Sequence, residues 1–408
     1  MKYLLLVGDG MGDTPVPALG DKTPLEAAAT PAMDELARGG ELLLVRTVPP
    51  GYPPGSDVAN LSLLGYAPEQ CYSGRAPLEA ASLGVALADD ELAFRCNLVT
   101  LEYGAEGAVR MVDYSAGHIS SDEARELVLA LDRHCGSERL RFHPGVSYRH
   151  LLVHRGEAPG LGTVPPHDHS GRDVTAHFRR YLTLPHLAEL FARSRALLAD
   201  HPVNTRRQAR GQNPANGIWL WGEGHPPQMT TIKQRYGISG ALISAVDLLK
   251  GLGVHAGLEI IQVPGATGYL DTNYAGKVQA ALEALTRHDF VLVHVEAPDE
   301  TGHQGDAGLK VRAIEEFDAR IVAPILAGLR QSGQDFRLVV GMDHYTPVEL
   351  RTHVDWPVPT LLYDSRGLAA PSAMTYTEAN CRAAATMPGH NFDDGPGFFA
   401  HLLQQGGA

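Results

Sequence analysis

The stretch from Asp289 to Asp306, D-F-V-L-V-H-V-E-A-P-D-E-T-G-H-Q-G-D, constrains the fold of this chain more than any other segment. Its first half is an unbroken run of branched and aromatic residues, which is typical of a strand buried in a parallel sheet. The run stops at Ala297-Pro298, and Asp299 and His303 follow four residues apart on a turn that contains Gly302. Ligands of open α/β sheets bind at that end of the strands. We therefore predict an α/β fold with a divalent-metal site at strand ends, since a carboxylate and an imidazole suit one such ion.

Length and charge limit the classes of partner. With 408 residues, 44% hydrophobic and 20% charged, the chain has the composition of a globular protein long enough for two domains. Its 34 Lys and Arg against 47 Asp and Glu give a formal net charge of -13 without any basic block, so nucleic acid is not an expected partner. A small phosphorylated metabolite remains compatible, because a local group of metal ions and arginines outweighs the net charge at short range.

Cysteine spacing and apolar runs bear on location. Cys71, Cys96, Cys135 and Cys381 have no C-x-x-C spacing, which predicts reduced thiols in a cytoplasm rather than disulfides or a zinc ribbon. The apolar run at the N-terminus is short and lacks a cleavage site, and no later run approaches the length of a membrane span. We expect a cytoplasmic protein without a membrane partner, and the sequence leaves the oligomeric state open.

The predicted first strand, Tyr3 to Val7, runs into G-D-G-M-G-D at residues 8 to 13. The glycines are similar to a dinucleotide-binding loop, but Asp13 stands where the third glycine is required. Asp9 would also place a negative charge against the pyrophosphate. We therefore interpret Asp9 as a metal ligand.

A Pro/Gly-dense loop leads into Ser56 and Asp57 and then into an apolar helix. Ser56 is thus predicted near a helix N-terminus, where backbone N–H groups can hold an anion. A lone serine at this position is more often only an N-cap. Beside a metal ion, however, a serine can act as a nucleophile without a histidine base, because coordination lowers the pKa of its hydroxyl.

The α/β pattern is interrupted in the first half of the chain. Strand candidates at 93–101 and 148–153 alternate with helix candidates at 121–133 and 181–200, while 156–173 reads as a polar surface loop. We predict an inserted α+β domain at 76–210 and a metal-binding core at 1–75 and 211–408. Five side chains are candidates for holding a phosphate or carboxylate: Arg75, His118, Arg149, His150 and Arg172.

The α/β pattern returns from Asn216. We predict strands at 217–221, 259–263 and 337–340, a last edge strand at 359–363, and helices at 238–251, 276–287 and 310–329. The segment A-G-K at 275–277 lacks the spacing of a phosphate-binding P-loop. The strand at 337–340 leads into G-M-D-H-Y-T-P, which places Asp343 and His344 just past its end, and His353 follows after a short loop.

Oxygen and nitrogen donors therefore gather at several strand ends. They are too many for one tetrahedral ion but suit two divalent ions a few ångströms apart. Mixed carboxylate and imidazole ligands favour manganese, zinc or magnesium-like ions. The predicted set is Asp9, Ser56, Asp299, His303, Asp343, His344 and His353.

These motifs resemble those of a known family. D-G-M-G-D at the start, G-S-D-x-A near residue 56, D-E-x-G-H at 299–303 and D-H-x-T-P at 343–347 are similar to the archaeal-type, 2,3-bisphosphoglycerate-independent phosphoglycerate mutases of the alkaline phosphatase superfamily. The resemblance extends to G-R-A-P-L-E-A at 74–80, D-Y-S-A-G-H-I at 113–119, Y-R-H-L-L at 148–152 and V-P-G-A-T-G at 263–268. It implies a three-layer α/β/α core with a mostly parallel sheet and an inserted domain that closes over the substrate.

The resemblance also implies residue roles. Ser56 becomes phosphorylated and returns the group to the other hydroxyl of a bound glycerate. One metal ion is held by Asp9, Ser56, Asp343 and His344, and the other by Asp299, His303 and His353. Manganese is the first choice, with magnesium, zinc and cobalt as alternatives.

Some positions depart from the family pattern and keep alternatives open. Glu296 stands where the archaeal mutases tend to have a lysine, and Asn60 stands where they have a histidine. Bacterial relatives with H-V-E-A-P-D-E-x-G-H resemble a subgroup proposed to act as homoserine kinases, in which Glu296 would meet a substrate ammonium. A phosphatase-like hydrolase and a non-catalytic metal-binding relative are further alternatives.

Overall fold

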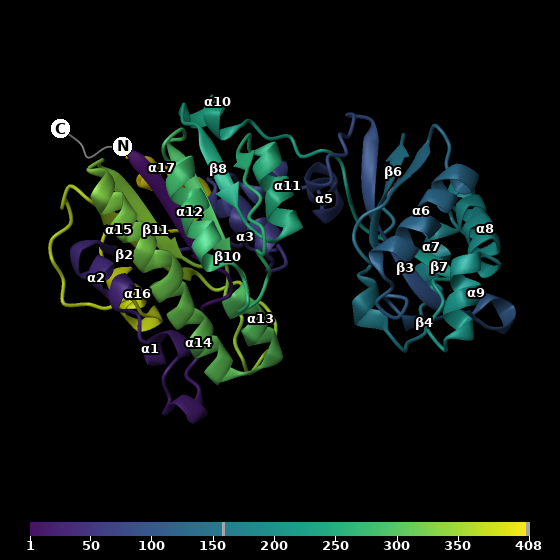
Figure 1. The fold of residues 1–408 in the computed structure, drawn as a ribbon, viewed down its shortest axis with the longest axis horizontal. Coiled ribbons are helices and arrows are strands. Elements are labelled where there is room, and N and C mark those ends of the chain that lie inside the picture. Colours follow the sequence, from purple (N-terminus) through teal and green to yellow (C-terminus); the bar gives the residue numbers. More distant parts are fainter. Residues whose placement is uncertain (157–159, 405–408) are drawn as a thin grey trace. The chain divides into compact units, whose positions relative to one another are not determined.

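The computed structural model of the chain describes residues 1–156 and 160–404 and consists of two compact units (Figure 1). The larger unit contains Met1–Tyr72 and Gln228–Ala408, and the smaller one contains Ser73–Pro227. The insertion therefore extends beyond the predicted range of 76–210. The strand at Gly217–Gly224 falls within the predicted core range but lies in the smaller unit, because it pairs with a long strand there.

The larger unit is built on an eight-stranded sheet with the order β13-β2-β12-β11-β1-β10-β8-β9. The central strand β1 pairs in parallel with β10 on one side and with β11 on the other. The strands are β1 (Lys2–Gly8), β2 (Glu41–Val45), β8 (Gly240–Ile243), β9 (Glu259–Ile260), β10 (Phe290–Val295), β11 (Phe336–Gly341), β12 (Val358–Asp364) and β13 (Asn391–Phe392).

Burial of both faces explains the apolar strands at the centre of this sheet. Every residue of β10 is buried, and β10 pairs in parallel with β8 as well as with β1, which confirms the parallel strand predicted from its sequence. Strand β12, in contrast, is not at an edge as predicted. It lies between β11 and β2 and is antiparallel to both, because β2 and β13 extend the sheet beyond it.

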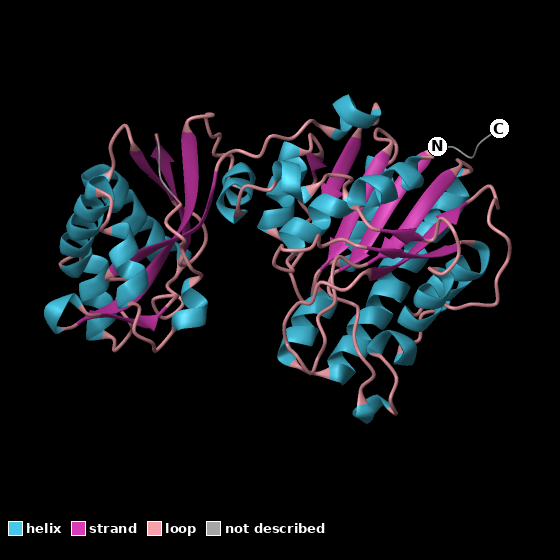
Figure 2. Cartoon of the chain, turned by 180° about the vertical axis from the view of Figure 1, so that it is seen from behind, coloured by secondary structure: helices cyan, strands magenta, loops and turns pink. Residues whose placement is uncertain are grey.

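Helices lie on both faces of the sheet, as a three-layer α/β/α fold requires (Figure 2). The segment predicted as one helix at 238–251 is instead strand β8 followed by a separate helix, α11. The helices of the larger unit are α1 (Pro24–Ala27), α2 (Pro31–Gly39), α3 (Ser56–Leu63), α4 (Pro68–Cys71), α10 (Ile232–Tyr236), α11 (Asp247–His255), α12 (Tyr274–Ala284), α13 (Ala297–Gln304), α14 (Ala307–Phe317), α15 (Ala323–Ser332), α16 (Glu378–Ala384) and α17 (Gly395–Leu403), with a π-helical turn at Asp318–Val322 and a 3-10 turn at Pro17–Leu19.

The smaller unit is an antiparallel sheet with the order β4-β3-β6-β5, in which β7 also pairs with β3. Its main core includes Phe94, Cys96 and Leu98 of β3, and helices α6, α8 and α9 pack on this side. The elements are α5 (Arg75–Ser82), β3 (Glu91–Tyr103), β4 (Val109–Asp113), α6 (Ser121–Cys135), β5 (Leu140–His143), β6 (Arg149–Arg155), α7 (Thr175–Tyr181), α8 (Pro185–Ala199), α9 (Pro202–Ala209) and β7 (Gly217–Gly224), with 3-10 turns at Ala105–Gly107 and Pro166–His169.

Within the described residues, no helix is both long enough and apolar enough to cross a lipid bilayer. All four cysteines are free and buried.

Candidate metal centre

The carboxyl ends of the three central strands bring the predicted ligands to one edge of the larger sheet. Asp9 directly follows β1, and Asp343 follows β11 after one intervening residue. Asp299 lies in the first turn of α13, just past β10, so its carboxylate is on a helix rather than on the predicted turn. Because parallel strands end at the same edge, the three carboxylates meet although the sequence separates them widely.

One group of possible ligands is fully buried. It consists of Asp9, His294 and Asp343, whose ligand atoms lie within 4.8 Å of one another. Nε2 of His294 is 3.0 Å from Oδ2 of Asp9, yet it has no hydrogen-bond partner, and Oδ1 of Asp9 has none either. Buried polar atoms without partners are rare in folded proteins, so these atoms fit a bound cation.

A second group adjoins the first. Asp299, His344 and His353 offer ligand atoms within 4.8 Å of one another, and Nε2 of His303 is 3.2 Å from Oδ2 of Asp299. The Nδ1 atoms of His303 and His353 contact the carbonyl oxygens of Arg351 at 3.0 Å and of Pro54 at 3.2 Å. A backbone carbonyl that accepts a hydrogen bond from Nδ1–H fixes the tautomer in which Nε2 carries no proton. Histidines that bind a metal ion through Nε2 usually have this arrangement.

His344 lies between the two groups, and Ser56 faces it. Nε2 of His344 is 3.1 Å from Oγ of Ser56, 3.5 Å from Oδ1 of Asp9 and 3.4 Å from Oδ2 of Asp343. Ser56 is the first residue of α3, so its hydroxyl also lies at the positive end of a helix dipole. The structure therefore brings together all seven side chains that the sequence predicts as metal ligands.

Burial and mutual contact shift the pKa values in this centre. Burial, followed by the charges of Asp343 and Asp299, raises the pKa of Asp9 well above its ordinary value. Burial opposes ionisation of Asp299 too, but its contacts with His303 and His353 hold the pKa of Asp299 well below the ordinary value. The same contact with Asp299 raises the pKa of His303 to about 9. Three carboxylates packed so closely need positive charge nearby, which is the environment that a divalent cation provides.

Hydrogen bonds outside the ligand groups hold the loops in place. The Gly10 N–H donates to Oδ1 of Asp343 at 3.2 Å, and the Asn60 amide donates to Oδ2 of Asp343 at 3.0 Å. Gly10 has φ +62°, and a Cβ there would lie 2.6 Å from the Asp299 carboxylate, so only glycine fits. Nζ of the buried Lys310 donates to the Gly12 carbonyl at 3.0 Å and to the Thr346 carbonyl at 2.8 Å, which joins the two ligand-bearing loops.

Glu296 lies in the same unit as this centre. Burial, followed by the charge of Glu300, raises the pKa of Glu296 to about 8, and the charge of Lys277 opposes that shift. Lys277 is buried, and its ammonium donates to the His294 carbonyl at 2.9 Å. The predicted substrate residue Glu296 is thus a half-buried carboxylate beside the ligand-bearing end of β10.

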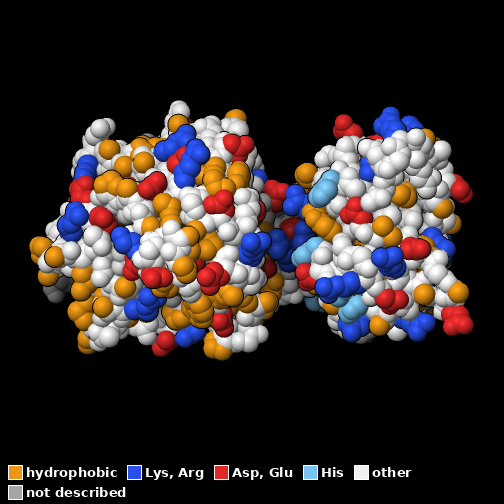
Figure 3. Space-filling view, turned by 90° about the horizontal axis from the view of Figure 1, so that it is seen from below, with side chains coloured by type: hydrophobic (Ala, Val, Ile, Leu, Met, Phe, Trp, Pro, Cys, Tyr) orange, Lys and Arg blue, Asp and Glu red, His pale blue; other side chains and the backbone are white. Residues whose placement is uncertain are grey.

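In the smaller unit, arginines gather beside the face of β3 that carries Ala93 and Asn97. Burial lowers the pKa of Arg95 to about 10, Glu79 opposes this shift, and the charges of Arg75 and Arg149 add to it. The Arg95 guanidinium lies 4.0 Å from the centroid of the Trp221 ring, and its Nε is 2.9 Å from Glu79. Figure 3 shows Lys or Arg and His side chains gathered on the surface of this unit. The group is a candidate site for an anionic ligand.

The other predicted substrate residues are placed differently. His118 packs edge-on against Tyr114 and Tyr148, with ring centroids 6.2 and 6.1 Å away. His150 follows Arg149 on β6 and therefore points into the core, where it is buried and burial lowers its pKa to about 3. Arg172 is exposed beside β4, and its carbonyl accepts from the Met111 N–H at 3.0 Å. The structure does not bring His150 to the arginine group.

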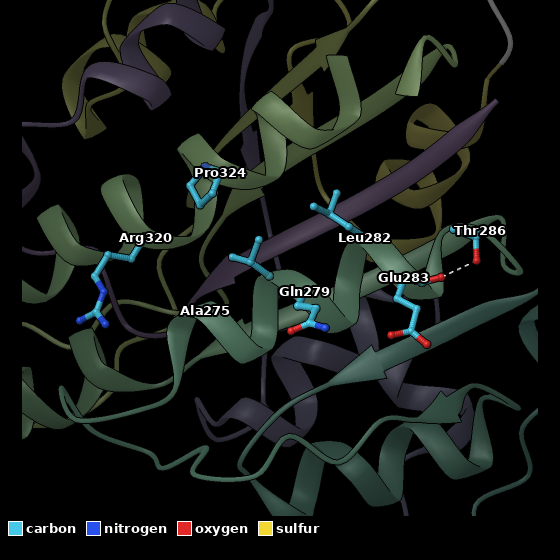
Figure 4. Close-up of a pocket in the computed structure, with 8 residues that line it drawn as sticks. Ala275, Gln279, Leu282, Glu283, Thr286, Arg320 and Pro324 are labelled. Atoms are coloured by element: carbon cyan, nitrogen blue, oxygen red, sulfur yellow. Dashed lines mark hydrogen bonds between the residues drawn. The ribbon is translucent and has the colours of Figure 1, made fainter. Parts of the chain in front are cut away.

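A groove elsewhere on the larger unit lacks the chemistry of the metal centre. It is lined by α12, the π-helical turn and the start of α15, with Gln279, Leu282, Arg320 and Pro324 among its residues (Figure 4). Its carboxylate, Glu283, has no second acidic or histidine neighbour in the lining, so the groove offers no ligand set.

Sequence reasoning missed two residues of these sites. His294 lies inside a strand whose other residues are apolar, and Arg95 lies between Phe94 and Cys96 in a strand that is buried over residues 91–101, so the sequence predicts each as part of a buried run. A signal existed in the alternation of side chains along a strand. His294 faces the Asp9 side of β10, and Arg95 shares the face of Ala93 and Asn97 on β3.

Comparisons with known proteins agree with this geometry. The profile of a family described as "2,3-bisphosphoglycerate-independent phosphoglycerate mutase" matches residues 37–204. A Geobacter sulfurreducens protein named "Probable 2,3-bisphosphoglycerate-independent phosphoglycerate mutase" is 52% identical over 94% of this chain and 96% of its own. A solved structure from Pyrococcus horikoshii is 28% identical, with a TM-score of 0.80 over 100% of this chain and 99% of that chain. The cofactor-independent phosphoglycerate mutase of Thermoplasma acidophilum is 26% identical, with a TM-score of 0.66 over 99% of this chain and 100% of that chain.

Proposed function

This chain belongs to the family of 2,3-bisphosphoglycerate-independent phosphoglycerate mutases, and on that premise we propose that it interconverts 3-phosphoglycerate and 2-phosphoglycerate through a phosphorylated Ser56. The observation that carries the proposal is the position of Ser56. Its hydroxyl stands at the start of α3, 3.1 Å from His344, beside three carboxylates and three further histidines. A serine so placed has little structural reason to lie there, since it does not cap the helix.

Two divalent ions, manganese by preference, are part of the proposal. Asp9, Asp343 and His344 with Ser56 would hold one ion, with His294 as a further donor, and Asp299, His303 and His353 would hold the other. Bound ions of this kind lower the pKa of a serine hydroxyl and neutralise the charge that spreads over a phosphoryl group in transfer.

The chain's own residues supply the remaining steps. The Ser56 hydroxyl gives up its proton as Oγ forms a bond to phosphorus and the ester bond to glycerate breaks, and the departing glycerate oxygen takes up a proton. The other glycerate hydroxyl then gives up its proton as it attacks the phosphoserine, the bond from Oγ to phosphorus breaks, and Oγ of Ser56 takes up a proton again. In-line placement is the main requirement of such a transfer. The Asn60 side-chain amide donates a hydrogen bond to the Ser56 carbonyl at 2.9 Å at the start of α3, which supports such a placement of Ser56.

Substrate binding is proposed for the arginine group of the smaller unit. We propose that Arg75, Arg95 and Arg149 hold the carboxylate or phosphate of glycerate, because guanidinium groups bind planar anions with two parallel hydrogen bonds. His118 and Arg172 are expected to contribute at the edge of this group. The same proposal includes a cytoplasmic location, which the four free, buried cysteines support.

Glu296 favours a second candidate, a kinase that phosphorylates the hydroxyl of an amino acid such as homoserine. A half-buried carboxylate with a pKa raised to about 8 gains stability from an incoming ammonium group. In that case Glu296→Lys would abolish homoserine turnover, and unchanged turnover in the variant would remove this candidate.

The test of the main proposal is phosphorus NMR of 3-phosphoglycerate mixed with manganese-loaded protein. A growing 2-phosphoglycerate signal is expected for the wild type, and none above background for Ser56→Ala. Retained metal content in Ser56→Ala would show that the loss lies in the nucleophile. No conversion by folded, metal-loaded wild type would contradict the mutase, and ATP with L-homoserine would then be assayed.

A further inference from the structure

Helix α3, which carries Ser56 at its first position, is hydrogen-bonded near both ends to the segments that connect the two units. The chain leaves the larger unit after Tyr72 and returns to it at Gln228. Tyr72 lies shortly after α3 in the sequence, whereas Gln228 is far from α3 in the sequence. Contacts between α3 and both segments are therefore a feature of the fold and not of chain continuity alone.

The first connection is attached at the start of α3. The Tyr72 hydroxyl donates to Oδ2 of Asp57 at 2.7 Å, and Oδ1 of Asp57 accepts from the Val58 N–H at 3.0 Å. Asp57 is buried and directly follows Ser56. The Tyr72 ring packs beside the buried cluster of Val48, Val58 and Ala59. The hydroxyl of Tyr72 thus holds the residue next to the nucleophile.

The second connection is attached at the other end of α3. The Tyr66 hydroxyl donates to the Thr230 carbonyl at 2.8 Å. Arg235 and Tyr236 of α10 both donate to the Gly65 carbonyl, at 2.7 and 3.1 Å. Gly65 has φ +80°, and a Cβ there would lie 2.7 Å from both the Tyr236 hydroxyl and Phe399, so this junction has no room for a side chain.

The two connections also lie side by side where they enter the smaller unit. The Ser73 hydroxyl donates to the His225 carbonyl at 2.5 Å. A Cβ at Gly224 would lie 2.5 Å from the Ser73 carbonyl oxygen, and a Cβ at Gly74 would lie still closer to the Glu223 carbonyl oxygen. Because the two segments are packed together there, a displacement of one must be followed by the other.

From these contacts we infer that Tyr72 is a positioning residue for phosphoryl transfer, which couples the connection between the units to the orientation of Ser56 through Asp57. Tyr72 does not contact the reacting atoms. Loss of its hydroxyl releases the Asp57 carboxylate and lets the Ser56 turn shift. Since a misplacement of about 1 Å lowers the rate of such reactions about 100-fold, a smaller shift at Ser56 lowers kcat about 10-fold. The inference rests on the proposed function for its effect on kcat but not for its effect on the mobility of the turn.

The test compares Tyr72→Phe with Tyr52→Phe. Tyr52 packs edge-on against Tyr72 at 6.2 Å between centroids, and within the described part of the chain its hydroxyl makes no hydrogen bond, so the same atom is removed without breaking the attachment. We expect Tyr72→Phe to lower kcat about 10-fold with KM and Tm nearly unchanged. We also expect faster hydrogen exchange of the backbone amides at 56–59, and wild-type behaviour from Tyr52→Phe.

The double variant Tyr72→Phe with Asp57→Asn tests the coupling itself, because the losses of kcat from two changes in one contact are not additive. The double variant should be no slower than the slower single variant. An unchanged kcat in Tyr72→Phe, equal losses in Tyr52→Phe, or additive losses in the double variant would overturn the coupling. If the wild type lacked mutase activity, the proposed function would fail, while unchanged exchange at 56–59 in Tyr72→Phe would still separately overturn the attachment.

Discussion

His303 and His353 in the larger unit and His154 and His186 in the smaller unit form two pairs with nearly the same separation and opposite shifts of pKa. The Nε2 atoms are 2.9 Å apart in the first pair and 2.8 Å apart in the second, and the ring centroids are 4.8 and 4.9 Å apart. The contact with Asp299 raises the pKa of His303 to about 9, whereas burial, followed by the charge of His186, lowers that of His154 to about 4.

The neighbouring carboxylates account for the difference. Asp299 faces both imidazoles of the first pair, at 3.2 and 3.3 Å. Within residues 1–156 and 160–404, the second pair belongs to no group of three possible ligands. A nearby carboxylate, which completes a group of three possible ligands, distinguishes the larger unit's centre from the pair in the smaller unit.

The largest expected effect comes from removing the buried ammonium group of Lys310 in the larger unit. Lys310 and Asp13 are fully buried and 2.8 Å apart, so Lys310→Met leaves an uncompensated carboxylate. We expect the free energy of unfolding to fall by about 3–5 kcal/mol in urea titrations. Lys250→Met, which breaks the partly exposed pair with Asp247, should lower it by less than about 1 kcal/mol. Similar losses in both variants would mean that the buried Asp13 carboxylate does not depend on the Lys310 cation.

Asp299→Asn tests directly whether the carboxylate accounts for the difference between the two histidine pairs. Outer partners of metal ligands are typically worth about 10–100-fold in affinity or activity, so loss of this ligand should lower mutase activity by about 100-fold or more. Bound metal, measured by mass spectrometry after dialysis, should fall from two ions to one. His154→Gln is the matched control and should retain both ions. Loss of an ion in His154→Gln with full loading of Asp299→Asn would reverse the comparison.

The smallest effect is the acid sensitivity of the second pair. Because the pKa of His154 is lowered in the folded protein, its contribution to stability is present above pH 6.5 and is lost as the pH falls towards about 4. His154→Gln should therefore lose about 1–2 kcal/mol less stability than the wild type between pH 7 and pH 5. Urea titrations of metal-free protein at both values measure this difference. Equal losses in the two proteins would show that His154 is not held neutral by the fold.

Much of the larger unit could be predicted from its sequence because local pattern and global position agree there. Strand β10 is apolar throughout since both of its faces are covered, and Asp9, Asp299 and Asp343 meet because parallel strands end at one edge. The order of strands is not a local property, so β12 was misplaced at an edge. Strand β8 was merged with α11 because only Ser244 to Val246 separate two apolar segments and no proline or glycine marks the turn.

The smaller unit was harder to predict, because its functional side chains alternate with core residues along the strands. His150 looks like a partner of Arg149 in the sequence, yet adjacent strand residues point to opposite faces. Arg95 stands between Phe94 and Cys96 and reads as part of the core run, although its guanidinium contacts Glu79 and the Trp221 ring. Which face carries the arginines depends on α5 and β7, whose packing no local pattern specifies.

Anomalous diffraction from crystals grown with manganese tests the central claim most directly, because it places each ion without reference to activity. The account predicts two peaks in the larger unit, one beside Asp9 and Asp343 and one beside Asp299, His303 and His353, and no peak between His154 and His186. A peak at the His154–His186 pair, or no manganese among the three carboxylates, would contradict it.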